Sequence, residues 1–149
     1  MDGTEAEPRA EKTPPSLLYM VKQVELAVRS RLDELVRPYG ITALQYTALT
    51  VLERHDGLSA AQLARDSFVT AQSTADLVRS LESRTLIRRE RNPRNRRELL
   101  ISLTAEGREV LAGCAEPVRQ LEARMVRDLT ARQADQLRQA LSRTWHALS

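Results

Sequence analysis

Three segments of the sequence open with the same local pattern, a Ser or Thr followed three residues later by Gln. They begin at Thr42, Ser59 and Thr130, and each precedes apolar residues at helical spacing. The hydroxyl can accept a hydrogen bond from the first helical turn, while the Gln side chain can accept one from the N–H of the first residue. The pattern therefore predicts helices over residues 43–54, 60–66 and 131–148.

Three further segments are predicted to be helical. Apolar residues recur at threes and fours over residues 16–37, after which a Pro and a Gly end the pattern. Thr70 opens another helix after a connection that allows only a tight turn, so residues 59–84 match a helix-turn-helix. Thr104 opens a long helix over about residues 105–128.

A β-hairpin follows the helix-turn-helix. Its first strand begins at Leu86, Asn92 and Pro93 mark the turn, and the alternating residues 99–103 form the return strand. The order of elements is then α-α-α-α-β-β-α-α. This order predicts a mainly α fold with a small β-hairpin wing, a winged helix-turn-helix with helices at both ends.

The chain divides into parts on this interpretation. They are a disordered tail over residues 1–15, a winged helix-turn-helix DNA-binding domain over 42–104, and helical regions over 16–37 and 105–149. The terminal helices carry long apolar stripes that one small lobe cannot cover. We expect these stripes to form the interface of a two-fold homodimer.

Arginines cluster around the predicted hairpin turn. The stretch RRERNPRNRR, which begins at Arg88, holds six Arg in ten residues. Residues 84–97 carry seven Arg and one Glu in a chain whose net charge is only +3, so the remainder is net acidic. Such clustering predicts a local contact with a polyanion. Aromatic residues make up only 3%, too few to stack on unpaired bases, so double-stranded DNA is the expected partner.

Other classes of protein find little support. The sequence has no Gly-rich phosphate loop and no His/Cys cluster with metal-ligand spacing, so we expect no enzyme, no cofactor and no metal site. A single Cys fits a reducing cytoplasm, and no apolar run is long enough to cross a membrane. A winged helix that binds proteins is an alternative, although it would not need the Arg cluster.

Three stretches resemble the MarR family of bacterial transcriptional regulators. They are GITALQYTAL at residues 40–49, LSAAQLARDSFVT at 58–70 and LVRSLESRTLIRRERNPRNRRELLISLTAEG at 77–107. The resemblance implies a DNA-binding regulator, expected to be a repressor, that is dimeric, cytoplasmic and bound to the nucleoid through a pseudo-palindromic operator. Three positions depart from the family pattern: Asn95 replaces an Asp, Thr85 a Gly, and Asp76 an Arg.

The hairpin and the second helix of the helix-turn-helix supply the expected DNA contacts. By the resemblance, Arg97 enters the minor groove, whereas Arg94 and Arg96 meet phosphates. Residues at the start of the second helix are expected to be exposed and to face base edges. These are Gln72, Ser73 and Thr74.

Several polar residues have two alternative roles. Ser59 and Thr70 either cap their helices or also hold phosphates, and Arg79 and Arg84 suit contacts with the DNA backbone. Asp76 either accepts a hydrogen bond from cytosine N4 or pairs with Arg79 or Ser80 without touching DNA.

The resemblance also implies an effector pocket between the terminal helices and the winged lobe, often for a small aromatic or phenolic acid. Its candidate lining residues, each of which ordinary packing would also explain, are Met20, Tyr39, Tyr46 and His55. A constitutive regulator without an effector is one alternative. A redox sensor based on Cys114 is another, against the default of a buried, inert thiol.

Overall fold

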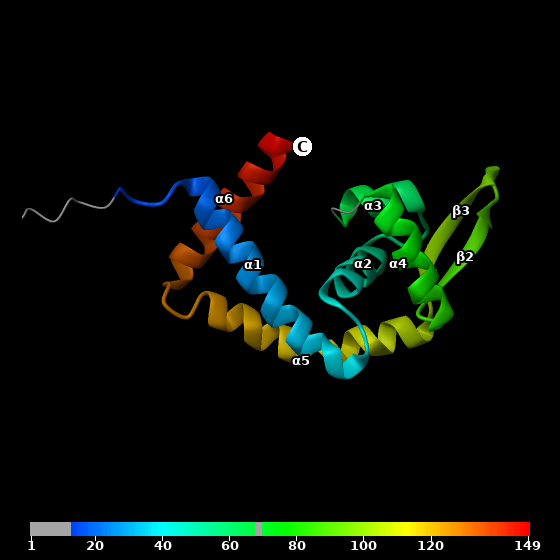
Figure 1. Ribbon diagram of the computed structural model, residues 1–149, viewed down its shortest axis with the longest axis horizontal. Coiled ribbons are helices and arrows are strands. Elements are labelled where there is room, and N and C mark those ends of the chain that lie inside the picture. The colour runs from blue at the N-terminus through cyan, green and yellow to red at the C-terminus, as the bar shows by residue number, and fades with distance from the viewer. Residues whose placement is uncertain (1–12, 68–69) are drawn as a thin grey trace, which may run out of the picture.

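Six α-helices and a three-stranded sheet make up the part of the chain that the structure, a computed structural model, describes: residues 13–67 and 70–149 (Figure 1). The elements are α1 (Leu17–Val36), the 3₁₀ helix η1 (Arg37–Tyr39), α2 (Ala43–Arg54), β1 (Leu58–Ser59), α3 (Ala60–Asp66), α4 (Ala71–Ser83), β2 (Ile87–Asn92), β3 (Asn95–Leu103), α5 (Ala105–Met125) and α6 (Ala131–Leu148). Most of the tail predicted over residues 1–15, and Phe68 and Val69 of the predicted tight turn, lie outside the described residues.

The mainly α fold with a β-hairpin is confirmed. Figure 1 shows two groups of elements: α1 and α6 lie on one side, whereas α2, α3, α4 and the sheet lie on the other. The long helix α5 runs from beneath the hairpin lobe to the side of α1 and α6. This arrangement separates a candidate DNA lobe from the terminal helices.

All three predicted capping boxes are present. The hydroxyl oxygens of Thr42, Ser59 and Thr130 accept hydrogen bonds from backbone N–H groups at 3.1, 3.2 and 3.2 Å, and each Gln side chain accepts one from the N–H of its cap residue. The helices they open span residues 43–54, 60–66 and 131–148, as predicted.

The sheet differs from the prediction in two ways. The return strand begins at Asn95 rather than Leu99, and the two-residue strand β1 pairs with it through Leu58 and Ile101. The residues nearest the turn lack apolar alternation because both of their faces are exposed, yet their backbone groups still pair across the hairpin. Apolar spacing therefore finds only the half of the hairpin that packs on the core.

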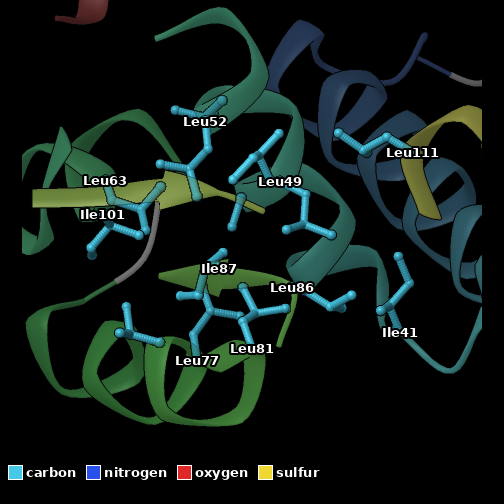
Figure 2. Packing of buried hydrophobic residues seen from close by; sticks show 14 of the residues in the cluster. Ile41, Leu49, Leu52, Leu63, Leu77, Leu81, Leu86, Ile87, Ile101 and Leu111 are labelled. Carbon is cyan, nitrogen blue, oxygen red and sulfur yellow. The ribbon is translucent and has the colours of Figure 1, made fainter. Parts of the chain in front are cut away.

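One apolar core holds the hairpin lobe together. Its most buried side chains come from α2, α3, α4 and β3; Leu49, Leu52, Leu63, Leu81 and Ile101 are each at most 1% exposed (Figure 2). Leu111 and Cys114 of α5 join the same cluster. The core thus fixes which face of α4 is turned inward.

The end of α4 has a backbone feature that positions the hairpin. The N–H of Leu86 donates to the carbonyl of Leu81 at 3.0 Å, and that of Thr85 to Glu82 at 2.9 Å, which is the Schellman arrangement. Thr85 takes the left-handed conformation, with φ of 60°, that glycine usually supplies there. The helix therefore ends as it would with glycine, at the steric cost of a β-branched residue.

Gly107 lies in the first turn of α5, close against the backbone that leads into β2. A Cβ at this position would lie 2.2 Å from the carbonyl oxygen of Leu86. Only a residue without a side chain lets the first turn of α5 approach the start of β2 this closely. Thr104, the cap of α5, binds the same region by donating its hydroxyl to the carbonyl of Thr85 at 2.6 Å.

Candidate nucleic-acid interface

Helix α4 turns a polar face away from the core. Residues are spaced by about 100° around a helix, so a set of four residues lies opposite the buried Leu77, Val78 and Leu81. This outward face consists of Gln72, Asp76, Arg79 and Ser83, all exposed. Its polar and charged composition suits contact with base edges and phosphates rather than with an apolar surface.

The expectation that Thr74 is exposed is wrong. Its side chain is 1% exposed, and its hydroxyl donates to the carbonyl of Thr70 at 2.8 Å. The position falls on the inward face of α4 because Thr74 lies three, four and seven residues before the buried Leu77, Val78 and Leu81. Gln72 and Ser73, in contrast, are exposed as expected.

Asp76 and Arg79 form an ion pair on the outward face of α4. Their side chains are 66% and 68% exposed, so water screens the attraction and the pair adds little to stability. Of the two roles predicted for Asp76, the free chain therefore shows the one in which it pairs with Arg79.

The tip of the hairpin is ordered by two Asn side chains. Asn92 accepts a hydrogen bond from the N–H of Arg94 at 2.9 Å and donates to Glu98 at 3.1 Å. Asn95, which replaces the family's Asp, accepts from the backbone N–H of Arg97 at 3.3 Å. Asn95 thus holds the backbone of Arg97 and leaves the guanidinium exposed.

A hollow of about 520 Å³ lies between α4 and the hairpin. Arg79 of α4, Arg89 of β2 and Arg97 of β3 line it, together with apolar side chains such as Val78 and Leu99. Arginine side chains from three elements therefore line the space between α4 and the hairpin.

Arg89 ties the hairpin to α4. Its Nε and a terminal nitrogen donate to the two carboxylate oxygens of Glu82 at 2.7 and 2.8 Å. The hydrogen bonds from Arg89 hold the pKa of Glu82 below its ordinary value, and those bonds raise the pKa of Arg89. This bidentate pair joins β2 to the last turn of α4 and so favours one angle between the hairpin and that helix.

Two further residues of the predicted DNA set are engaged within the protein. Arg84 donates to the carbonyl of Gly40 and, at 3.1 Å, to that of Tyr39, so it closes the end of η1 instead of pointing outward. Ser59 is 9% exposed and its hydroxyl donates to its own capping Gln62 at 3.1 Å. The cap role is the one that the geometry of Ser59 supports.

Thr70 keeps both of its alternative roles. Its oxygen accepts from the N–H of Ser73 at 3.2 Å, and its hydroxyl donates to the side chain of Ser73 at 3.0 Å. Both residues remain exposed at the start of α4.

Comparison with known proteins identifies the family. A family model described as "MarR family" matches residues 39–98. The HTH-type transcriptional repressor Rv2887 of Mycobacterium tuberculosis is 30% identical over 125 residues, covering 84% of this chain and 90% of that protein. The chain belongs to the MarR family. Its relatives and its fold are those of transcriptional regulators, not of enzymes.

Solved structures agree with this membership. The transcriptional repressor CouR bound to a 23-mer DNA duplex is 27% identical, with a TM-score of 0.79 over 87% of this chain and 92% of that one. A probable transcriptional regulator from Pseudomonas aeruginosa is 26% identical, with a TM-score of 0.76 over 87% of this chain and 96% of that one. This MarR-family chain thus shares its fold with both proteins over 87% of its length.

The four effector candidates of this MarR-family member lie in different surroundings. Met20 is 49% exposed, and His55 is exposed at the end of α2. Tyr39 donates its hydroxyl to the carbonyl of Gly113 at 2.7 Å, and Tyr46 packs against the core. Burial raises the pKa of Tyr46, with smaller contributions from nearby Cys114 and acidic groups. Packing explains Tyr39 and Tyr46 better than a shared ligand does.

A different cavity lies between α1 and α2. It has a volume of about 680 Å³ and apolar walls that include Val24, Val28 and Leu44. Ser67 also lines it; this residue is 3% exposed, and its hydroxyl has no hydrogen-bond partner among the described residues. The sequence missed this cavity because Ser67 follows α3 and is far from α1 in the chain.

The single thiol is poorly suited to redox chemistry. Cys114 is 1% exposed, and burial raises its pKa, so little thiolate forms. Within residues 13–67 and 70–149, no cluster of acidic, His or Cys side chains could hold a metal ion. None of the helices in that part of the chain has the length and apolarity to span a bilayer.

Proposed function

We propose that this MarR-family regulator binds duplex DNA as a homodimer, with α4 in the major groove and the β2–β3 hairpin at the adjacent minor groove. The observation that carries the proposal is the hollow between α4 and the hairpin, which Arg79, Arg89 and Arg97 line. A DNA strand separates a major groove from the neighbouring minor groove. The phosphates of that strand would therefore pass over this hollow.

The contacts divide by location. Gln72 and Ser73 at the start of α4 face base edges, and Thr70 can hold a phosphate in addition to capping the helix. Arg94 and Arg96 near the hairpin tip meet phosphates, and Arg97 enters the minor groove. Thr74 and Arg84 are not part of this set because both are bonded within the protein.

The terminal helices form the dimer. Helix α6 has no buried residue along its 18 residues. Its apolar residues are spaced by threes and fours, and four of them are exposed: Leu137, Leu141, Trp145 and Leu148. The first half of α1 is equally exposed, with Leu17 at 80% and Val24 at 53%. A second copy of the chain covers both surfaces in this proposal, because no single chain leaves such stripes in water without cost.

A small molecule that fills the α1–α2 cavity lowers operator affinity in this proposal. The cavity combines apolar walls with the hydroxyl of Ser67, which has no hydrogen-bond partner within residues 13–67 and 70–149, so it suits a small amphipathic effector. Because its walls come from both the terminal helices and the DNA lobe, its occupancy can change the distance between the two α4 helices. The alternative to an effector-controlled repressor is a constitutive regulator, which binds its operator with the same affinity whether or not a small molecule is present.

Selection of duplexes from a randomised library with the full chain tests the proposal. We expect enriched sites to be pseudo-palindromic, with half-site centres about 10 base pairs apart. Light scattering should give a dimer for the free protein and for the complex. Failure to enrich any duplex, or full-affinity binding to a single half-site, would contradict the proposed function.

A further inference from the structure

Asp76 has an unusual position for an acid in a surface that meets DNA. It lies at the centre of the outward face of α4, four residues after Gln72 and three before Arg79. The other acid of α4, Glu82, is turned aside and bonded to Arg89. Asp76 is therefore the one negative charge on the face of α4 that would approach the bases.

A carboxylate there opposes unselective binding. Phosphates repel it, and the groove removes part of its hydration, so its entry is unfavourable unless a donor replaces the lost water. Two bases present an amino donor in the major groove, adenine through N6 and cytosine through N4. Cytosine is the one that suits a carboxylate, because adenine sets the acceptor N7 beside its amino group. The penalty is then offset only at sites that offer a cytosine opposite Asp76.

Asp76 also controls a nearby cation. It holds Arg79 in an ion pair in the free chain, and Arg79 lines the hollow over which the DNA strand would pass. The pair is more than half exposed at both side chains, so it can open at little cost. When Asp76 turns to a base, Arg79 is released toward a phosphate.

We propose that Asp76 is a specificity-determining residue: it restrains Arg79 in the free protein and exchanges that partner for a cytosine amino group at the operator. The inference rests on the proposed function, because it requires α4 to enter the major groove. On unselected DNA the exchange lacks a base partner, and Asp76 weakens binding. The same side chain thus disfavours wrong sites and reads one base pair.

Duplexes selected by the wild-type full chain and by Asp76→Ala test this inference. The wild type should enrich a C·G pair at one position of each half-site, and the variant should lose that preference. The ratio of affinities for the selected duplex and for a scrambled duplex should fall by about tenfold. On scrambled DNA the variant should bind more tightly, with a salt dependence steeper by about one phosphate per protomer because Arg79 is released.

A matched pair on another helix supplies the control. Glu116 and Arg119 of α5 have the same spacing and similar exposure, 61% and 70%, so Glu116→Ala should change neither affinity. If Asp76→Ala does not fold, Asp76→Asn removes the charge with the shape retained, and it should also lower the affinity ratio. Equal base preferences and equal ratios for wild type and variant would overturn the inference alone. Failure of the wild type to enrich any duplex would overturn the proposed function with it.

Discussion

The hydroxyl of Tyr39 donates a hydrogen bond of 2.7 Å to the carbonyl of Gly113, which lies in the middle of α5. This carbonyl has no helical donor, because Pro117 stands four residues later and lacks an N–H. A Cβ at Gly113 would lie 2.6 Å from the Tyr39 ring. The phenol thus occupies the space of a missing side chain and satisfies an otherwise unpaired carbonyl, which joins η1 to α5.

Replacement of Tyr39 by Phe should lower the free energy of unfolding by about 1 kcal/mol, since the Gly113 carbonyl loses its donor. In a Pro117→Ala background the cost should be smaller, because that substitution restores a backbone N–H that can donate to the carbonyl. Denaturant unfolding of the wild type, the two single variants and the double variant, all at one protein concentration, measures this coupling. The same cost in both backgrounds would show that the two residues act independently.

Thr85→Gly should stabilise the protein by about 1 kcal/mol, because glycine takes the left-handed conformation without steric cost. The bonds of the Thr85 backbone to Glu82 and Thr104 do not depend on its side chain. Thermal melts report the change. Thr85→Ala is the control, since it keeps the strain and should not stabilise; a destabilised glycine variant would refute the strain argument.

The Glu82–Arg89 pair predicts a pH dependence. The folded pKa of Glu82 lies below its ordinary value of 4.5, so the stabilisation is present above that value and is lost as pH falls through the lowered pKa. The difference in melting temperature between wild type and Glu82→Gln should therefore be constant near neutral pH. It should shrink as the pH falls below 4.5 and through the lowered pKa of Glu82. A difference that stays constant to the acid end of that range would contradict the assignment.

The hairpin arginines should differ in their effect on DNA binding. Arg97→Ala is expected to weaken operator binding by about 1–3 kcal/mol, as for one specific contact. Arg94→Ala and Arg96→Ala should weaken specific and non-specific binding alike and flatten the salt dependence by about one unit each. Operator titrations at several salt concentrations, with melts to check folding, measure both effects.

Arg119→Ala on α5 serves as the charge-matched control and should bind like wild type. If Arg97→Ala behaves as the other two hairpin variants do, its assignment to the minor groove is wrong. If all three bind DNA like wild type, the Arg cluster has no role in DNA binding, and a protein-binding winged helix becomes the better interpretation.

The dimer proposal predicts that Leu141→Glu yields monomers, because Leu141 is 51% exposed in the single chain and lies on the apolar stripe of α6. Light scattering gives the mass. Gln139→Glu adds the same charge on the opposite face of α6 and should remain dimeric. Deletion of residues 130–149 should likewise give monomers or insoluble protein, and a well-folded dimer after that deletion would exclude α6 from the interface.

The sequence by itself determined where the helices begin and where the hairpin turns. A capping box joins a hydroxyl, a Gln and two N–H groups within four residues, so Thr42, Ser59 and Thr130 mark helix starts whatever surrounds them. The turn at Asn92 and Pro93 is equally local. The order of these elements then predicted the winged helix-turn-helix, and the family motifs agreed with it.

Only the tertiary structure decided which side chains of these elements are available. Thr74 lies three, four and seven residues before Leu77, Val78 and Leu81, so helical spacing already places it on their buried face, and the prediction of its exposure overlooked that spacing. Arg84, in contrast, is engaged by carbonyls more than forty residues earlier in the chain, which no local pattern shows. The pairing of β1 with β3 and the bond from Tyr39 to Gly113 also join distant segments. Hydrogen bonds that span three or four residues can be predicted from the spacing of residue types in the sequence. The engagement of Arg84 and the hydrogen bond to the Gly113 carbonyl depend instead on which remote segments the fold brings into contact.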